Sequence, residues 1–398
     1  MTRYSALFKI GAFAVALPAS IYIGILSLLI ASTSLQTHVF YLHRVTLTWH
    51  DLSIPEMFGF MPRQVASFSI DTSDGEILHA WHVLPLGLYH RAQDLLLDEA
   101  LPSIKEHYPQ THLGLLRDDP EARLVIYLHG TSGTIGSGWR PDSYRTISAA
   151  SPEKIHVLSV EYRGYGLSSG TPSEAGLLED AITAVTWAMD IAHIPASRIL
   201  IFGQSLGTAV GISLTHHFAS QMPPVNFAGL VLVASFTDVA TLTGTYRIGG
   251  IVPVLSPLKT IPWLFAYFTG FLQSTWISKK RLTEFVKLAE AGNAEYHITM
   301  IHAENDMDIP VSHTHELYWH AVNASMSTGV SYEELERSKE STKVDQGHGG
   351  YVTTWQTSRG TIKEVVTKYG NHDRLMSYPV AGLAVLQAFQ VADAKFKE

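Results

Sequence analysis

Short apolar runs alternate with helical patterns along most of this chain. Six runs are bounded by turn-forming residues and have the length of buried strands. They are residues 123–130, 154–164, 198–205, 227–235, 297–306 and 362–370. Between most of them lie segments such as 173–192, whose apolar residues recur at three- and four-residue spacing and predict helices. This alternation indicates an α/β architecture with a mainly parallel sheet covered by helices on both faces.

Two segments depart from the alternation. Residues 65–71 and 77–85 flank the turn Thr-Ser-Asp-Gly and predict a strand hairpin. Residues 236–295 are rich in Pro, Trp and Phe and are longer than an ordinary connection between strands. They predict a helical insertion, which packs on the domain, forms a lid whose apolar inner face lines an acyl pocket, or does both.

The N-terminus predicts a membrane anchor. Residues 11–32 carry no charge, and a helix of that length reaches roughly 33 Å, enough for a bilayer core. A signal peptide is the alternative, but its apolar region is usually about 7–15 residues long, and no clean cleavage site follows. Arg3 and Lys9 precede the segment and Arg44 follows it, a balance that slightly favours a cytoplasmic N-terminus and a luminal body.

These patterns divide the chain into four parts. We expect an anchor at residues 1–35, a first part of the main domain at 36–235, the lid insertion at 236–295 and a second part of the main domain at 296–398. Composition agrees with a large soluble core, since 46% of the 398 residues are hydrophobic. The absence of cysteine excludes disulfides and thiolate chemistry. The net charge of −8, without a basic cluster, argues against a nucleic-acid partner.

The candidate nucleophile is Ser205. It stands in Gly203-Gln204-Ser205-Leu206-Gly207, which matches G-x-S-x-G between a predicted strand and a predicted helix. In such a turn the flanking glycines remove the Cβ atoms that would clash where strand and helix approach. The helix N-terminus then offers the backbone amide of Leu206 to an oxyanion.

A second oxyanion donor is expected after an earlier strand. His129 and Gly130 end the run at 123–130, and the amide of Thr131 follows them. His129 is also a conceivable base, but its place before a glycine suits loop orientation better. We therefore predict Thr131 and Leu206 as the oxyanion amides and a structural role for His129.

The serine needs a base and an orienting acid, and on this architecture the chain order is serine, acid, histidine. Asp306 lies at the carboxyl end of the run at 297–306, ahead of a turn, and is the predicted acid. Asp308 is the second candidate for this acid. Glu304 in the same stretch is predicted to be a solvated or structural carboxylate.

Two histidines compete for the role of base. His372 follows the last predicted strand and precedes a helical pattern, the position in which a triad histidine belongs, so we predict His372. His348 lies in a polar stretch without a preceding strand and remains the alternative. The other histidines lack the carboxylate partners and strand-end context of a metal site, so we predict no metal and no other cofactor.

The chain resembles the α/β-hydrolase-domain serine lipases, particularly the membrane-anchored branch that includes the lysophosphatidylserine and monoacylglycerol lipases. The likeness spans roughly residues 60 to 390 and rests on LHGTSGT, VEYRGYGLSSGTPSEAGLLEDA, GQSLGTAV, HAENDMDIPV and GNHDRLMSYP. It implies an α/β-hydrolase fold, the triad Ser205, Asp306 and His372, and an association with the endoplasmic reticulum. Two features depart from the family pattern. The region at 327–360 is longer than the one that family members usually have before the histidine, and Glu161 stands where an Asp is common before Tyr-Arg-Gly.

Together these observations predict a single-pass membrane-anchored serine hydrolase that cleaves a lipid carboxylic ester, a monoacylglycerol or a lysophospholipid, through an acyl-enzyme. A protein acyl-thioesterase, which removes acyl groups with the same triad, is the alternative. A non-catalytic scaffold on a hydrolase fold is a more remote one.

Overall fold

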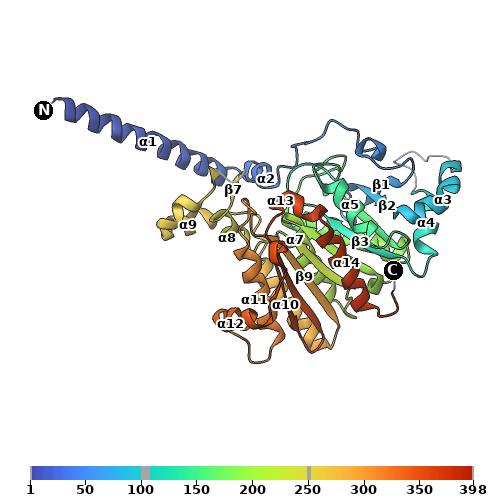
Figure 1. Ribbon diagram of the computed structural model, residues 1–398. Coiled ribbons are helices and arrows are strands. Elements are labelled where there is room, and N and C mark those ends of the chain that lie inside the picture. Colours follow the sequence, from blue (N-terminus) through green and yellow to red (C-terminus); the bar gives the residue numbers. More distant parts are fainter. Residues whose placement is uncertain (1, 100–107, 249–251, 397–398) are drawn as a thin grey trace.

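A computed structural model of the chain describes residues 2–99, 108–248 and 252–396, with backbone alone for residues 2–15 (Figure 1). Met1 of the predicted anchor, residues 249–251 of the predicted lid and residues 397–398 lie outside the described residues. A twisted sheet forms the centre of the body, and helices cover both of its faces.

Ten of the described strands form one sheet in the order β1-β2-β4-β3-β5-β6-β9-β12-β11-β10. The strands are β1 Val65–Asp71, β2 Ile77–Val83, β3 Arg123–Leu128, β4 Ile155–Val160, β5 Ile199–Gln204, β6 Gly229–Val233, β9 Tyr296–Ala303, β10 Val344–Asp345, β11 Tyr351–Gln356 and β12 Gly360–Thr367. A separate ribbon pairs β7 Arg247–Ile248 with β8 Val252–Pro253. All six predicted strands and the predicted hairpin are present.

The sheet is mixed rather than mainly parallel. The five pairings from β4 to β12 are parallel, but β1, β2 and β4 pair antiparallel at one edge, and β12, β11 and β10 pair antiparallel at the other. Sequence analysis missed β10 and β11, because half-exposed edge strands lack the continuous apolar run of the central strands. Parallel strands still bring their carboxyl ends to one edge, where ligands bind in such sheets.

The described helices form two layers and a group above the sheet. They are α1 Thr2–Ala31, α2 Thr33–Tyr41, α3 Leu86–Asp98, α4 Gln110–Arg117, α5 Arg140–Ala149, α6 Glu174–Thr186, α7 Leu206–Ala219, α8 Val239–Thr243, α9 Pro262–Thr269, α10 Ser278–Gly292, α11 Ser312–Ser325, α12 Tyr332–Thr342, α13 Asn371–Arg374 and α14 Pro379–Ala392. Helices α5 and α14 pack on one face, whereas α6, α7, α10 and α11 pack on the other. Alternate residues of the central strand β5 point to opposite layers. Ile201 points to the layer of α6, α7, α10 and α11, and Phe202 points to the layer of α5 and α14.

The predicted insertion at 236–295 contains two different kinds of structure. Helix α10 packs against α7 and α11 and is part of the layer over the sheet. The described residues of the segment at 239–272, which are 239–248 and 252–272 with α8, α9 and the β7–β8 ribbon, instead stand beside α1 and α2 (Figure 1). The domain boundaries drawn from the sequence stay a prediction.

The N-terminal segment forms two helices at an angle. Helix α1 covers the predicted anchor and projects from the body, and α2 follows it (Figure 1). No single helix in the described part of the chain passes the length and hydropathy test for a bilayer span. Two bent pairs pass that test together: residues 16–31 with 33–41, bent by 108°, and residues 371–377 with 379–392, bent by 52°.

Candidate active site

Ser205 occupies the sharp turn between β5 and α7. Its backbone has φ 52° and ψ −117°, which is rare for a residue with a side chain and is a strain typical of functional sites. A Cβ on Gly203 would lie 2.3 Å from the carbonyl oxygen of Gly207, and one on Gly207 would lie 1.9 Å from that of Leu128. The two glycines therefore permit the close approach of strand and helix that holds the serine in place.

The structure brings the three predicted triad residues together. The hydroxyl oxygen of Ser205 lies 2.8 Å from Nε2 of His372, and Nδ1 of His372 lies 2.8 Å from Oδ2 of Asp306. Ser205 follows β5, Asp306 follows β9, and His372 lies in α13 after β12. These strands are parallel within the sheet, so residues up to 167 positions apart meet at its carboxyl edge.

The carboxylate of Asp306 is held by more than His372. The backbone amides of Asp308 and Ile309 donate to Oδ1 at 3.0 and 2.9 Å, and Nε2 of His302 lies 3.2 Å from Oδ2. Burial opposes ionisation, but the hydrogen bonds from His302 and His372 outweigh it and hold the pKa of Asp306 well below its usual range. Asp306 is therefore a charged acceptor at neutral pH.

His302 is a supporting residue that sequence analysis did not assign. Its ring lies within β9 and is fully buried, with Nε2 donating to the carbonyl of Ile309 at 2.9 Å and Nδ1 2.7 Å from the hydroxyl of Thr314. The only sequence signal was its position four residues before Asp306 in the same predicted strand. A histidine inside an apolar strand does not reveal its partners.

The imidazole of His372 is tuned by its acidic neighbour. Burial favours its neutral form, but the hydrogen bond and charge of Asp306 outweigh burial and raise the pKa of His372 to about 9. The side chain of His372 stays 11% exposed. The competing His348 lies exposed in a turn between β10 and β11, at the edge of the sheet. Glu304 is also exposed.

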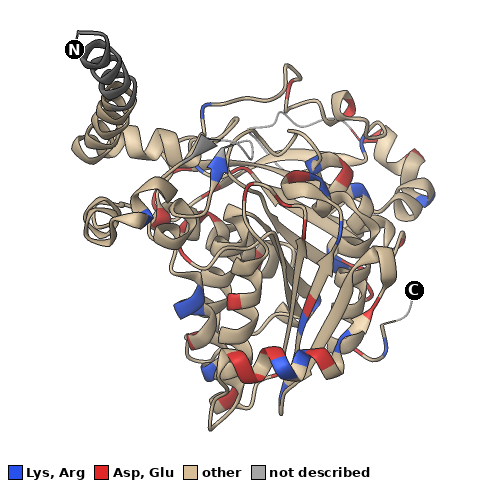
Figure 2. Cartoon of the chain, turned by 60° about the vertical axis from the view of Figure 1, so that its left-hand side comes forward, with Lys and Arg blue, Asp and Glu red and all other residues tan. Residues whose placement is uncertain are grey.

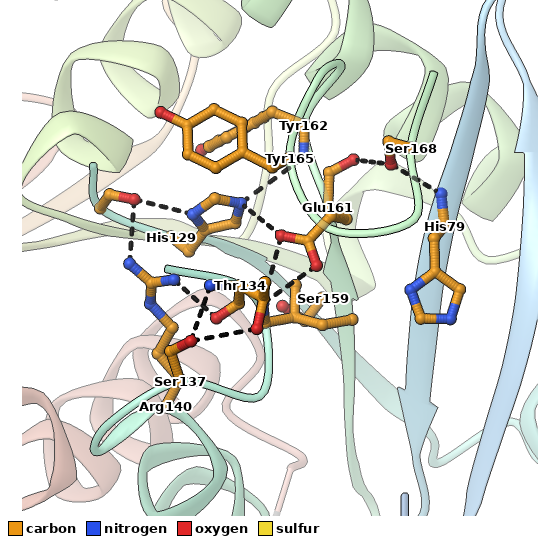
Figure 3. A network of polar contacts seen from close by, with 12 residues as sticks. His79, His129, Thr134, Ser137, Arg140, Ser159, Glu161, Tyr162, Tyr165 and Ser168 are labelled. Atoms are coloured by element: carbon orange, nitrogen blue, oxygen red, sulfur yellow. Dashed lines mark hydrogen bonds and ion pairs between the residues drawn. The ribbon is translucent and has the colours of Figure 1, made fainter. Parts of the chain in front are cut away.

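The loop that carries Thr131 is fixed by one guanidinium. Arg140, at the start of α5, donates to the carbonyls of Gly130, Thr131, Ser132 and Thr134 at 2.6–3.2 Å (Figure 3). A planar fork of donors can satisfy several carbonyls at once, which a lysine cannot do. Sequence analysis missed Arg140, since contacts to backbone carbonyls leave no motif.

His129 and Glu161 lie beneath the same loop, both fully buried (Figure 3). Nδ1 of His129 donates to the carbonyl of Gly130 at 2.8 Å, and its Nε2 lies 3.6 Å from Glu161. Both oxygens of Glu161 accept from the amide of Ile135 at 3.2 Å. Burial raises the pKa of Glu161 to about 8 and lowers that of His129 well below its ordinary value, so both are neutral at pH 7.

An apolar cavity of about 350 Å³ opens beside the serine. Ser205, Thr131 and Leu206 lie in its wall, and the amide of Leu206, at the start of α7, has no acceptor within its own helix. The volume falls in the range of about 300–1,000 Å³ that small-molecule sites occupy. Among the described residues, no group of three or more His, Cys, Asp or Glu side chains is placed to hold a metal ion.

Known proteins resemble this chain over most of its length. The family described as "Alpha/beta hydrolase family" matches residues 125–381. "Lysophosphatidylserine lipase ABHD12" of Xenopus tropicalis is 27% identical over 303 residues, which are 75% of this chain and 68% of that protein. "Protein ABHD12B" of Homo sapiens is 27% identical over 279 residues, 69% of this chain and 66% of that protein.

A solved structure supports the same fold. The alpha-beta hydrolase from Vibrio vulnificus has a TM-score of 0.52 at 15% identity, over 89% of this chain and 90% of that one. The predicted enzyme class, a carboxylic ester hydrolase, is confirmed by the matched family and relatives. Because the family match covers more than half of its residues, the chain belongs to the alpha/beta hydrolase family.

Proposed function

We propose that this chain is a membrane-anchored serine hydrolase that cleaves carboxylic esters of lipids, a monoacylglycerol or a lysophospholipid, with Ser205, His372 and Asp306 as its catalytic residues. The observation that carries the proposal is the continuous hydrogen-bonded chain of these three side chains, at 2.8 Å for each contact, beside an apolar cavity. The relatives named lysophosphatidylserine lipases support a lipid substrate.

In the first half of the reaction, neutral His372 accepts the proton of the Ser205 hydroxyl through Nε2, while the oxygen attacks the ester carbonyl carbon. Asp306 holds the ring in the tautomer with Nδ1 protonated and stabilises the imidazolium. The amides of Thr131 and Leu206 receive the oxyanion. The leaving alcohol then takes the proton from Nε2, and the acyl group stays on the serine.

Water completes the cycle. It gives a proton to Nε2 of His372 and attacks the acyl carbonyl, the same two amides stabilise the second oxyanion, and Ser205 leaves with the returned proton. The products are a fatty acid and the alcohol formed in the first half. The chain's own residues supply each proton-transfer and charge-stabilising group in these steps.

The proposed anchor is the apolar part of α1. No Asp, Glu, Lys or Arg occurs between Lys9 and Arg44. Described side chains of α1 expose large apolar surface to the surroundings of the body, Ile21 by 55% and Leu28 by 62%. The flanking basic residues slightly favour a cytoplasmic N-terminus and a luminal body. The resemblance to the membrane-anchored lipases implies residence in the endoplasmic reticulum.

A fluorophosphonate probe tests the nucleophile. The full chain in detergent is expected to label, and Ser205→Ala is expected to abolish labelling and ester hydrolysis. Ser220→Ala is the matched control, because Ser220 is an exposed serine at the end of the same helix, α7. A folded wild-type protein that does not label would contradict the proposal, as would a Ser205→Ala variant that retains activity.

A substrate panel tests the lipid class. The detergent-solubilised protein is expected to release fatty acid from monoacylglycerols or from lysophospholipids, including lysophosphatidylserine. An S-acylated peptide in the same panel tests the thioesterase alternative. Cleavage of the peptide with no cleavage of any lipid ester would replace the proposed substrate class by that alternative.

A further inference from the structure

Helix α2 is attached directly to the loop that carries Thr131. The carbonyl oxygen of Tyr41, the last residue of α2, accepts three hydrogen bonds: from the hydroxyl of Thr131 at 2.7 Å, the amide of Ser132 at 3.1 Å and the hydroxyl of Tyr165 at 2.6 Å. Tyr41 itself is 1% exposed. The end of the N-terminal helix pair is therefore part of the active-site structure.

Helix α1 packs on the segment at 239–272. The hydroxyl of Tyr22 donates to the carbonyl of Val254 at 2.6 Å. Gln36 connects the start of α2 to the same segment, with Nε2 3.0 Å from the carbonyl of Phe271 and Oε1 accepting from the amide of Gln273 at 3.1 Å. A small buried cluster joins the two parts through Leu26, Leu255, Leu258 and Phe268.

The cavity beside Ser205 lies between these two parts. At one end it reaches Ser205, Thr131 and Leu206. One wall comes from the N-terminal helices and contains Leu26, Leu29, Ile30, Val39 and Phe40. The opposite wall comes from the segment at 239–272 and contains Leu242, Tyr246, Val254, Leu255, Phe268 and Leu272. Nearly all of this lining is apolar, so it favours a hydrocarbon chain over a polar ligand.

The outer surface of α1, α2 and α9 is apolar as well, whereas Arg247 and Lys259 are the exposed charges of the second wall among the described residues. No Asp, Glu, Lys or Arg occurs between Lys9 and Arg44 or between Lys259 and Lys279. On α9, Trp263 is 72% exposed. In Figure 2 the described turns of α1 are tan, without blue or red, whereas the helix at the bottom of the picture carries several charged residues. The walls of the cavity thus continue into the surface that suits a bilayer.

We infer that α1 and α2 are part of the acyl-binding site and that side chains of α1 limit the length of the acyl chain. A lipid whose ester carbonyl lies at Ser205 extends its chain between the two walls, toward the apolar end formed by α1 and α9. This inference rests on the proposed function, because it names the part of the substrate that the cavity holds. It gives the predicted anchor a second role in specificity.

Leu29 and Leu28 offer a matched pair for the test. Leu29 lines the cavity, whereas its neighbour Leu28 is 62% exposed and is not in the lining. Leu29→Trp fills space next to the chain, so kcat/KM for a p-nitrophenyl palmitate is expected to fall by about tenfold or more relative to p-nitrophenyl butyrate. Leu28→Trp is expected to keep the wild-type ratio of the two substrates.

The outcomes separate this inference from the proposed function. A wild-type protein that cleaves neither ester would overturn both. A wild-type protein that cleaves both, with an unchanged palmitate-to-butyrate ratio in Leu29→Trp, would overturn the role of α1 alone. An equal shift in Leu28→Trp would also overturn it, since that substitution reports the membrane surface rather than the cavity.

A second measurement does not depend on turnover or on a bulky substitution. The chain has no cysteine, so Leu29→Cys introduces a single thiol. Reaction of Ser205 with a hexadecyl fluorophosphonate is expected to protect this thiol from a maleimide, whereas a methyl fluorophosphonate is expected to leave it reactive. The thiol of Leu28→Cys is expected to react in both cases. Equal reactivity of the Leu29→Cys thiol after both probes would overturn the inference.

Discussion

At the scale of single residues, the site depends on the charge of Asp306 and on the strained backbone of Ser205. Asp306 keeps its negative charge because four donors surround its carboxylate, and that charge in turn raises the pKa of His372. Ser205 is held at a positive φ by the strand and helix on either side of it. Each of these features has a consequence that can be measured.

Asp306→Asn is expected to lower kcat by about 10⁴-fold, the loss seen when a triad aspartate is replaced in the serine-protease template. His372 must be neutral to accept the serine proton, so activity rises with pH as the imidazole loses its proton. Because the pKa of His372 is about 9, we expect this rise in activity near pH 9. Without the charge of Asp306 the pKa of His372 falls, and the residual activity rises at lower pH. A pH series of kcat/KM measures both effects.

Asp308→Asn is the control, since Asp308 was the alternative acid. Its side chain is half-buried beside the site, but the described contact to His372 Nδ1 comes from Asp306. We expect Asp308→Asn to retain most of the activity. Equal losses in the two variants would contradict the assignment of Asp306.

Glu161 makes stability depend on pH in a direction that can be tested. Its pKa is about 8 in the folded chain and near 4.5 when unfolded, because burial disfavours its charge. The stabilising contribution is complete below about pH 4.5 and is lost as pH rises through about 8. Glu161→Gln stays neutral and still offers an acceptor to the amide of Ile135. Its Tm is therefore expected to fall less than the wild-type Tm between pH 5 and pH 8, and an identical pH dependence would contradict this.

The sequence revealed the residues that follow strands and stand in motifs. Ser205, Asp306 and His372 could be predicted because strand ends and chain order restrict where each can lie. Arg140 and the carbonyl of Tyr41 could not, because they act through backbone atoms far away in the chain. No side-chain pattern records which carbonyl a distant donor reaches.

At the scale of elements, the site depends on how closely β3, β5 and α7 approach each other. A Cβ on Gly207 would lie 1.9 Å from the carbonyl oxygen of Leu128 in β3. Gly207→Ala must therefore move α7 and with it Ser205. We expect it to lower the free energy of unfolding by about 1–3 kcal/mol and to lower kcat as well.

Gly292→Ala is the matched control for that substitution. Gly292 is also a helical glycine, at the end of α10, but a Cβ there meets nothing within 4 Å. It is expected to stabilise the fold by about 0.4–1 kcal/mol through the unfolded chain and to leave kcat unchanged. Denaturant unfolding and ester assays compare the two. A Gly207→Ala variant as stable and active as wild type would show that α7 accommodates the methyl group.

The elements that the sequence predicted well are those buried on both faces. The central strands read as continuous apolar runs, and their positions agree with the structure to within a few residues. Strand β11 was missed because only Thr353 among its residues is fully buried, so its pattern resembles a polar loop. The bend between α1 and α2 was missed because uncharged residues continue across it, although Ser32 caps the start of α2 by accepting from the amide of Leu35.

At the scale of the whole molecule, an acidic body follows an N-terminal segment that carries no Asp, Glu, Lys or Arg from residue 10 to residue 43. The net charge is −8, so an anionic bilayer surface repels the body, and membrane binding is expected to come from apolar burial. Binding to membranes is therefore expected to resist both 1 M salt and alkaline carbonate. Sedimentation of membranes after each wash, followed by immunoblotting, measures this.

Substitutions to arginine test which surface of the protein binds the membrane. Ile21→Arg combined with Ile25→Arg is expected to weaken retention, since each Arg in a bilayer-embedded helix costs about 2.5–3.5 kcal/mol. Val344→Arg is the control, because Val344 is an apolar residue that is 61% exposed on β10, outside the N-terminal helices. Equal retention of the double variant and the control would contradict anchoring through α1.

The last strand of the sheet has a further consequence. Strand β10 has two residues, and it leaves few free amides and carbonyls along that side of the body. Molecules confined to a bilayer meet far more often than molecules diffusing in three dimensions, and an open strand would turn such encounters into growing β-assemblies. For a chain anchored as proposed, the short border at β10 leaves neighbouring copies little backbone to pair with at this edge of the sheet.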